Sequence, residues 1–366
     1  MGLMGLMGCS SEEERLPALA SIEVRGFVAG FEEAYGAYGA NGAHGATRAW
    51  SPPGGYSLFD EADKSIGIAF TQDGLEPKMG SFFKSSGKWR TSLEEITADT
   101  YYLYGYVPYN PGVQFIIADR NDAHATNYSS GAKVTLQNVP AVMSGDLCVV
   151  IGAKDGTDAE TVTGLRSGDF SYSAQAIDGN GDAGNYVFLL FDHLYAALRI
   201  KMKVHADYDA LRTIKLKSLR MKTQAGETTS TTKADILVDL KGTEGESPIQ
   251  SITYTPSGEA ITEPLEFWSS RNGETLTTEF SNYVGHFMPQ DITTLILTSV
   301  YDVYDKKGNL IRQGCMATNT MELSELFTGQ KTTRRGCRYT INMTIRPTYL
   351  YMLSEPDLND PTVTIE

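Results

Sequence analysis

Strict alternation of apolar and charged residues is the feature of this chain that most constrains its fold. In the run LRIKMKV (198–204), the even-numbered residues are apolar and the residues between them are Arg or Lys. Apolar residues recur at every second position in 214–216, 236–240 and 339–345. A period of two gives a strand one buried face and one wet face, as in antiparallel sheets. The pattern therefore predicts an all-β fold built from half-buried strands.

The length of the chain points to two domains. At 366 residues the chain is too long for one ordinary core. Hydrophobic residues make up 41% and charged residues 21%, with 36 Gly and 20 Tyr, which suits a turn-rich β protein. We expect two antiparallel β-sandwich domains in tandem, the first at 20–186 and the second at 187–366. The boundary is placed just after the loop DGNGDAGN, where turn-forming residues are densest.

Apolar runs in the first half of the chain read as strands. They are separated by stretches rich in Gly, Asn, Asp and Ser. The runs are SIGIAFT, YYLYGYVPY, VQFIIAD, AKVTLQNV and LCVVIGA.

Charge and motif content argue against several function classes. The formal net charge is −14 and there is no Lys/Arg run, so no nucleic-acid partner is expected. The sequence contains no H-E-x-x-H, G-x-S-x-G or C-x-x-C motif, so we expect no catalytic residue, no cofactor and no metal. His193 is most simply a packed side chain at the edge of a core, and Cys148 a buried free thiol.

The start of the chain resembles a lipoprotein precursor. Residues 6–9 (LMGC) resemble a lipobox, in which Cys9 would carry lipid, and the following SSEEE resembles a serine-plus-acidic surface export signal of Bacteroidetes. Only eight residues, without Lys or Arg, precede Cys9, which is short for a signal peptide. We expect residues 1–19 to be a signal and export segment, and the outer membrane to be a partner through the lipid. Of the other cysteines, Cys315 and Cys337 are the more plausible disulfide pair.

A glycine-alanine run stands between the first apolar stretch and the rest of the chain. The run YGAYGANGAHGATRAW (35–50) has little side-chain area to pack, so it should stay exposed and fit a protease cleft. Cleavage after Arg48 is the expected result. Arg25 and Arg15 are competing cleavage points, with Arg25 disfavoured because it would split a predicted strand. A decorative surface loop is the alternative interpretation.

Together these stretches resemble the fimbrillin family, subunits of the Bacteroidetes type V pilus. The resemblance rests on the lipobox, the strand SIEVRGFVAGF, the Gly-rich link to Arg48, the phrase LLFDHLYAALRIKMKV, and the C-terminal stretch that begins GCRYTINMTIRP. It implies two transthyretin-like β-sandwich domains, export as a lipoprotein, cleavage by an arginine-specific protease, and polymerisation with other fimbrial subunits by strand exchange.

Strand exchange needs a removable strand and a donor. The first strand would supply the apolar side chains Ile22, Val24, Phe27 and Val28 to a sheet of the first domain, filling an edge that would otherwise be open. After cleavage, a strand of a neighbouring subunit would take its place. The candidate donor is the C-terminal tail, with Tyr349, Tyr351, Val363 and Ile365. The alternative is that this tail packs as an edge strand on its own domain. A tip or anchor subunit could lack a donor.

A surface glycan-binding lipoprotein with β-sandwich domains is the alternative function. It would use exposed aromatic residues, for which Trp50, Trp89, Trp268 and the tyrosines of 101–109 are candidates. A glycan hydrolase would instead require a pair of carboxylates.

Overall fold

The computed structural model describes residues 22–34, 56–59, 64–93, 96–120, 127–156, 164–174, 186–225, 228–242, 247–291, 294–323, 332–346 and 362–365. Strands dominate these residues, and the prediction of an all-β fold is confirmed. A four-residue helix, α1 (Ala206–Asp209), and a short 3₁₀ turn at Tyr128–Ser130 interrupt them. None of the helices in the described ranges is long and apolar enough to cross a membrane.

One lobe contains a nine-stranded sheet, counted over the described residues. Its strands follow the order β3-β1-β13-β11-β7-β4-β5-β6, with β12 paired to β7. Their bounds are β3 (Tyr56–Leu58), β1 (Glu23–Ala29), β13 (Tyr186–His193), β11 (Cys148–Gly156), β7 (Asp99–Val107), β4 (Ile66–Thr71), β5 (Lys78–Ser85), β6 (Lys88–Thr91) and β12 (Ser171–Ala174).

A four-stranded sheet packs against one face of this sheet and completes the first sandwich. It has the order β18-β17-β9-β8. The strands are β18 (Ile249–Ala260), β17 (Thr231–Lys241), β9 (Gly131–Pro140) and β8 (Gln114–Asp119). Its side chains Val134, Ile236 and Val238 share a core with Tyr104 and Leu190 of the larger sheet.

Strand β13 is buried on both faces because the nine-stranded sheet curls. Phe188 and Leu190 join the core between the two sheets, whereas Val187, Leu189 and Phe191 join a second core. That second core is made by the sheet itself, since β6 at one end of the strand order contacts β1 near the other. This double burial explains why the sequence of β13 is a continuous apolar run rather than an alternating one.

The second lobe is a sandwich of two further sheets that share one core. The six-stranded sheet has the order β10-β20-β14-β23-β2, with β24 also paired to β23; the five-stranded sheet has the order β16-β15-β21-β22, with β19 paired to β15. Their bounds are β10 (Val142–Met143), β20 (Ser281–Phe287), β14 (Ala196–Val204), β23 (Cys337–Ile345), β2 (Glu32–Ala34), β24 (Thr362–Ile365), β16 (Thr228–Thr229), β15 (Arg212–Ala225), β21 (Thr294–Asp305), β22 (Leu310–Glu322) and β19 (Leu265–Thr275).

The alternation read from the sequence matches the burial of these strands. Along β14 the apolar residues are buried in the second-lobe core, and the Arg and Lys residues between them are half-buried. In β15 the pattern holds at Ile214 and Leu216 and then slips by one residue, so that Leu219 and Met221 are the next apolar residues in the core. A β-bulge between Leu216 and Ser218 causes this slip, because one extra residue reverses the faces of a strand.

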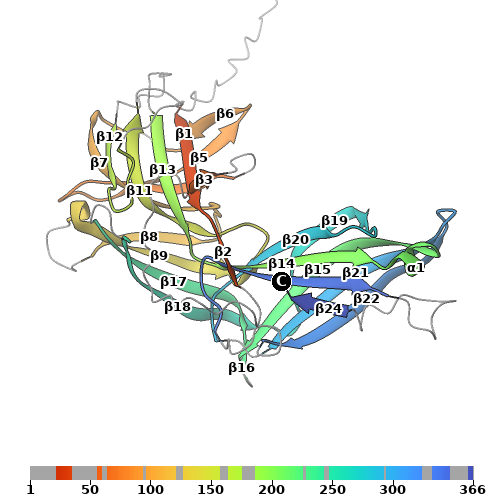
Figure 1. Ribbon diagram of the computed structural model, residues 1–366. Helices are drawn as coiled ribbons and strands as arrows, with labels where there is room; N and C mark the ends of the chain where they lie inside the picture. The colour runs from red at the N-terminus through yellow and green to blue at the C-terminus, as the bar shows by residue number, and fades with distance from the viewer. Residues whose placement is uncertain are drawn as a thin grey trace, which may run out of the picture.

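Sheet membership crosses residue 186, where the domain boundary was expected. Strand β13 lies in the nine-stranded sheet. Strand β17 pairs with β9 of the first lobe, and β18 pairs with β17, although both follow the second-lobe strands β14 and β15 in the chain. Figure 1 shows the two lobes, with β2 where they meet. Local apolar patterns carry no information on such long-range pairing, so a contiguous boundary was the simplest expectation available.

Candidate functional site

The N-terminal segment, residues 22–34, lies on both lobes. Its first strand, β1, pairs in parallel with β13, with Val24 opposite Val187 and Val28 opposite Phe191. Its second strand, β2, pairs in parallel with β23, with Glu32 opposite Cys337. The two strands are separated by Gly30 and Phe31 alone, so one short stretch of chain completes a sheet in each lobe (Figure 1).

The apolar side chains expected to anchor this segment lie against cores of the first lobe. Ile22 and Val24 are each 1% exposed and belong to the core formed by the curled sheet. Val28 is half-buried against the same core, whereas Phe27 is half-buried against the core between the two sheets. Strand β1 is covered on its second edge by β3, which pairs with it antiparallel at 27–29.

Gly26 allows β1 to lie close to its neighbours. A Cβ atom at this position would come within 2.9 Å of Cε2 of Phe191 and 3.1 Å of Cβ of Phe59. The backbone of Phe59 also donates a hydrogen bond to the Gly26 carbonyl at 2.9 Å. A side chain at residue 26 would therefore push β1 away from the aromatic residues that cover it.

The segment is held at the crossing between lobes by His193, at the end of β13. The Nε2 atom of His193 lies 2.6 Å from the carbonyl oxygen of Ala29. Because a carbonyl only accepts, Nε2 carries the proton of this hydrogen bond. The ring of Phe31 stacks on the His193 imidazole, with 3.8 Å between ring centroids. Both contacts fix the residues that join β1 to β2.

Charged side chains hold β2 on the second lobe. The Glu33 carboxylate accepts from Nε of Arg338 at 2.7 Å and from Nη2 of Arg199 at 3.4 Å. The Arg338 guanidinium also lies 5.9 Å from the Phe31 ring centroid. The backbone N–H of Glu32 donates to the Gly336 carbonyl at 2.8 Å. The hold on β2 is thus polar, in contrast to the apolar hold on β1.

The last strand of the chain shares an edge of β23 with β2. Strand β24 pairs antiparallel with residues 341–344, whereas β2 pairs with residues 337–339. Among the residues expected to form a donor strand, Val363 and Ile365 lie on β24, opposite Met343 and Ile341. The structure therefore has the end of the tail as an edge strand of its own lobe, the alternative left open by the sequence. Tyr349 and Tyr351 lie outside the described residues.

Only one of the proposed modification points falls within the described residues. Arg25 lies in β1, half-buried and opposite Phe188, which makes it a poor protease target while β1 is paired. Cys9, Arg15 and Arg48 lie outside the described residues.

The expected disulfide and the aromatic candidates for glycan binding take other roles in the structure. Cys315 and Cys337 are both buried and do not form a disulfide, so the pair favoured by the sequence is wrong: they lie on β22 and β23, strands of opposite sheets in the sandwich. Trp89 is 4% exposed, and Trp268 is half-buried with its ring 4.6 Å from that of Tyr283. These two tryptophans are packing residues rather than exposed platforms, while Trp50 lies outside the described residues.

The tyrosines of 101–109 are largely core residues as well. Tyr104 and Tyr106 are fully buried, and the Tyr104 hydroxyl donates to the Tyr128 carbonyl at 2.5 Å. Burial raises the pKa of Tyr104 well above its usual value. The run therefore reads as a buried strand and not as a binding face.

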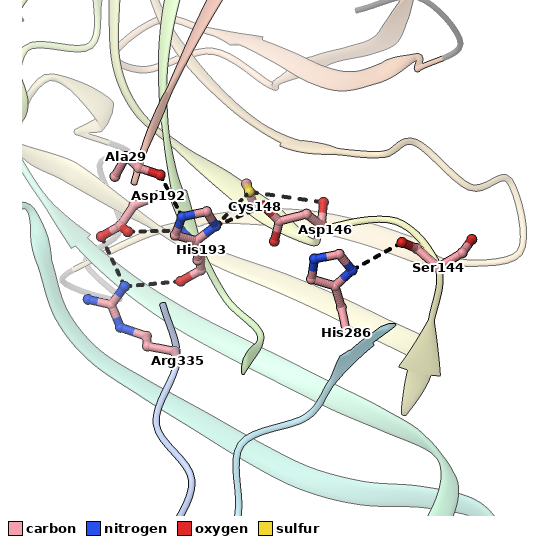
Figure 2. A network of polar contacts seen from close by, with 8 residues as sticks. All are labelled: Ala29, Ser144, Asp146, Cys148, Asp192, His193, His286 and Arg335. Atoms are coloured by element: carbon pink, nitrogen blue, oxygen red, sulfur yellow. Dashed lines mark hydrogen bonds and ion pairs between the residues drawn. The ribbon is translucent and has the colours of Figure 1, made fainter. Parts of the chain in front are cut away.

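A polar cluster lies directly under the crossing of the N-terminal segment (Figure 2). Nδ1 of His193 is 2.8 Å from Oδ2 of Asp146 and 3.6 Å from Sγ of Cys148. Burial raises the pKa of the Asp146 carboxyl, but its hydrogen bond and charge interaction with His193, together with smaller contributions from His286 and Cys148, outweigh this effect and the pKa is lowered. Burial also raises the pKa of the Cys148 thiol. We define Asp146, Cys148, His193 and the nearby His286 as the junction cluster.

An ion pair flanks this cluster on the side of the second lobe. Nη1 of Arg335 donates to Oδ2 of Asp192 at 2.9 Å and to the His193 carbonyl at 3.0 Å. Burial lowers the pKa of Arg335, but the neighbouring Asp192 carboxylate more than offsets this, so the pKa is raised. The contact fixes the backbone of His193 from below while Ala29 fixes its ring from the other side (Figure 2).

Sequence reasoning did not find the junction cluster. Its four residues come from the connection between β10 and β11, from β11, and from the ends of β13 and β20. No spacing rule links residues that are far apart in the chain and meet only through sheet pairing. His193 and Cys148 were singled out as separate buried residues, and nothing in the sequence indicated that they touch.

No family model and no curated protein matches this chain. Its fold is similar to that of a candidate cell adhesion protein from Bacteroides fragilis NCTC 9343, at 12% identity and a TM-score of 0.41, covering 94% of this chain and 97% of that one. A fimbrial protein from Bacteroides vulgatus ATCC 8482 is 13% identical, with a TM-score of 0.29 and coverage of 82% and 92%. The fimbrial anchor protein Mfa2 from Porphyromonas gingivalis is 9% identical, with a TM-score of 0.24 and coverage of 94% and 98%. These three structural neighbours are cell adhesion and fimbrial proteins of Bacteroidetes.

Proposed function

We propose that this protein is an adhesive or structural subunit of a surface fimbrium, and that its N-terminal segment is a temporary strand which a neighbouring subunit replaces. One observation carries the proposal: residues 22–34 lie as a strand inserted in the sheets of both lobes, parallel to β13 and then to β23. The resemblance of the sequence to the fimbrillin family, with its lipobox and its Gly-Ala run, supports the same function.

Release of the segment would make the binding of a replacement strand strongly favourable. Without β1, the edge of β13 would present unpaired N–H and C=O groups, and the sites of Ile22 and Val24 would be empty. Burial of these two side chains contributes about 1.5–3 kcal/mol each, so the apolar contacts alone supply roughly 3–6 kcal/mol. A strand of another subunit that pairs with β13 and fills the same sites would recover this free energy.

The cleavage point proposed at Arg48 suits such a release. It lies in the sequence between β2 and β3, so a cut there would separate residues 22–34 from β3 and from the rest of the chain. Strand β3 would remain with the body of the protein and lose β1 as its partner. The arginine-specific protease is thus a proposed partner, and the lipid on Cys9, cut off with the segment, is the proposed outer-membrane anchor of the precursor.

The replacing strand is proposed to come from the C-terminal tail of the neighbouring subunit. The tail includes β24, which pairs with β23 over only four residues. Such a short edge strand forms few backbone hydrogen bonds with its neighbour, so its detachment from β23 costs little free energy. Detachment would make residues 362–365 available to pair with another molecule.

Controlled proteolysis of the full-length chain tests this function. An arginine-specific protease should cut once, after Arg48, and the product should form SDS-resistant ladders. Arg48→Ala should abolish both the cut and the ladders, whereas Arg15→Ala should leave both unchanged. Ladders from the uncut Arg48→Ala chain, or a complete cut at residue 48 without any polymer, would contradict strand exchange.

A further inference from the structure

We propose that the junction cluster is a binding site for a zinc-class divalent cation, with Asp146, Cys148 and His193 as ligands and His286 as the candidate fourth ligand. A ligand atom of each of the first three residues lies within 4.8 Å of those of the other two. Thiolate sulfur, imidazole nitrogen and carboxylate oxygen are together the donor set that zinc prefers.

The ligand spacing fits a tetrahedral ion. With bonds of roughly 2.3 Å to sulfur and 2.0–2.1 Å to nitrogen, two ligands of a tetrahedral zinc ion are roughly 3.6 Å apart. Sγ of Cys148 and Nδ1 of His193 are 3.6 Å apart in the structure. Oδ2 of Asp146 and Nδ1 of His193 are 2.8 Å apart. That pair would open by roughly half an ångström to admit the ion, a shift that rotation of the Asp146 carboxylate can supply.

Both histidines are held in the orientation that metal ligands require. The proton on Nε2 of His193 is committed to the Ala29 carbonyl, so Nδ1 is the nitrogen that faces Asp146 and Cys148. In His286, Nδ1 lies 3.1 Å from the Ser144 carbonyl and carries the proton of that hydrogen bond. Its Nε2 therefore keeps a free lone pair in the neutral ring. A backbone carbonyl that accepts from the second ring nitrogen is the usual outer partner of a metal-bound histidine.

The surroundings of the cluster favour the binding of a cation. Oδ1 of Asp146 is buried and has no hydrogen-bond partner among the described residues. A cation bound by this carboxylate would satisfy that oxygen. Phe31 covers the site, since its ring stacks on His193 and lies 5.9 Å from the His286 ring. His193, His286 and Cys148 are all buried, so ligands from these side chains would be shielded from solvent, as in structural zinc sites.

A proton can take the place of the ion in the same geometry. In that arrangement one proton lies in the hydrogen bond between Nδ1 of His193 and Oδ2 of Asp146, and Cys148 keeps its thiol hydrogen. The two arrangements differ in one observable: only the metal-bound form contains a bond between a thiolate and a cation.

Titration with Co²⁺ distinguishes the two arrangements, since a thiolate bound to Co²⁺ gives a charge-transfer band in the near ultraviolet. The parent protein is the untagged, uncleaved full-length chain with Cys9→Ser, which leaves Cys148, Cys315 and Cys337 as the remaining cysteines. We expect one Co²⁺ per chain, the charge-transfer band, and displacement by Zn²⁺. Cys148→Ala should remove the band, and Cys337→Ala, a substitution at another buried cysteine, should keep it.

A second variant keeps the test decisive if Cys148→Ala alters the fold. Asp146→Asn preserves size and should weaken Co²⁺ binding by at least the roughly 10–100-fold that loss of an outer partner costs, with the thiolate band retained at saturation. Near-ultraviolet circular dichroism verifies the fold of each variant. Absence of the band in the parent protein, its persistence in Cys148→Ala, or unchanged affinity in Asp146→Asn would overturn the metal site. These measurements use uncleaved chain, so strand exchange can fail without affecting them.

Discussion

Truncation of Ile22 tests whether the N-terminal segment is held mainly by its apolar side chains. The Ile22 side chain is 1% exposed and lies in the core formed by the curled nine-stranded sheet. Replacement of a buried Ile by Ala typically costs about 2–5 kcal/mol, from lost transfer free energy and from the cavity left behind. At about 1.36 kcal/mol per tenfold change, this predicts a weakening of segment binding by roughly 30-fold to several thousand-fold.

The measurement uses protein cut after Arg48, in which the labelled segment stays bound without a covalent link. Its dissociation is followed by the fall in fluorescence polarisation of the labelled segment after excess unlabelled peptide of residues 16–48 is added. The parent segment is compared with the Ile22→Ala segment. Glu23→Ala is the matched control, because Glu23 is exposed on the same strand and its truncation should change binding by no more than about 0.5 kcal/mol. Equal dissociation of the Ile22→Ala and Glu23→Ala segments would refute the apolar hold on β1.

Three further outcomes follow from contacts described above. Gly26→Ala should destabilise the chain by about 1–3 kcal/mol in urea unfolding, because its Cβ would meet Phe191 and Phe59. Gly30→Ala is the control, since a Cβ there would have nothing within 4 Å and should leave stability unchanged. Equal urea midpoints for the two variants would contradict the close approach at Gly26. Glu33→Gln should weaken the hold on β2 by no more than about 1 kcal/mol, since the ion pairs with Arg338 and Arg199 are only half-buried, and the difference should vanish in high salt. Hydrogen bonds from the side chain and then the backbone of Asn309 lower the pKa of the exposed Asp305 carboxyl. The stabilisation from Asp305 is therefore present above its unfolded pKa and is lost as pH falls through its folded pKa. Asn309→Ala should raise the Asp305 pKa in an NMR titration, and an unchanged pKa would contradict this assignment.

Periodic patterns in the sequence were sufficient for the fold class and for many strands. The alternation in 198–204 predicts β14 because charged residues on one face and apolar residues on the other leave a strand one way to pack. The run SIGIAFT likewise corresponds to β4, and AKVTLQNV to β9. Each of these predictions depends on neighbouring residues alone.

Features that depend on contacts between distant residues could not be predicted from the sequence. The pairing of β17 with β9 joins strands that are separated in the chain by β10 to β16, and only the shared core between the two sheets selects it. The bulge in β15 shifts the buried face without a Gly or Pro to mark it. For the same reason the apolar anchors Ile22 and Val24 could be proposed from their own strand, whereas the contact between His193 and Asp146 could not.

The parallel pairing of β1 with β13 has a directional consequence for any assembly built on it. A replacement strand that reproduces the present register must enter with the same orientation, its amino end at Tyr186 and its carboxyl end toward His193. Each joint of the polymer would then be head to tail and identical to the last. A fibre made this way has two distinct ends, so growth and attachment to the cell can be assigned to different ends of one filament.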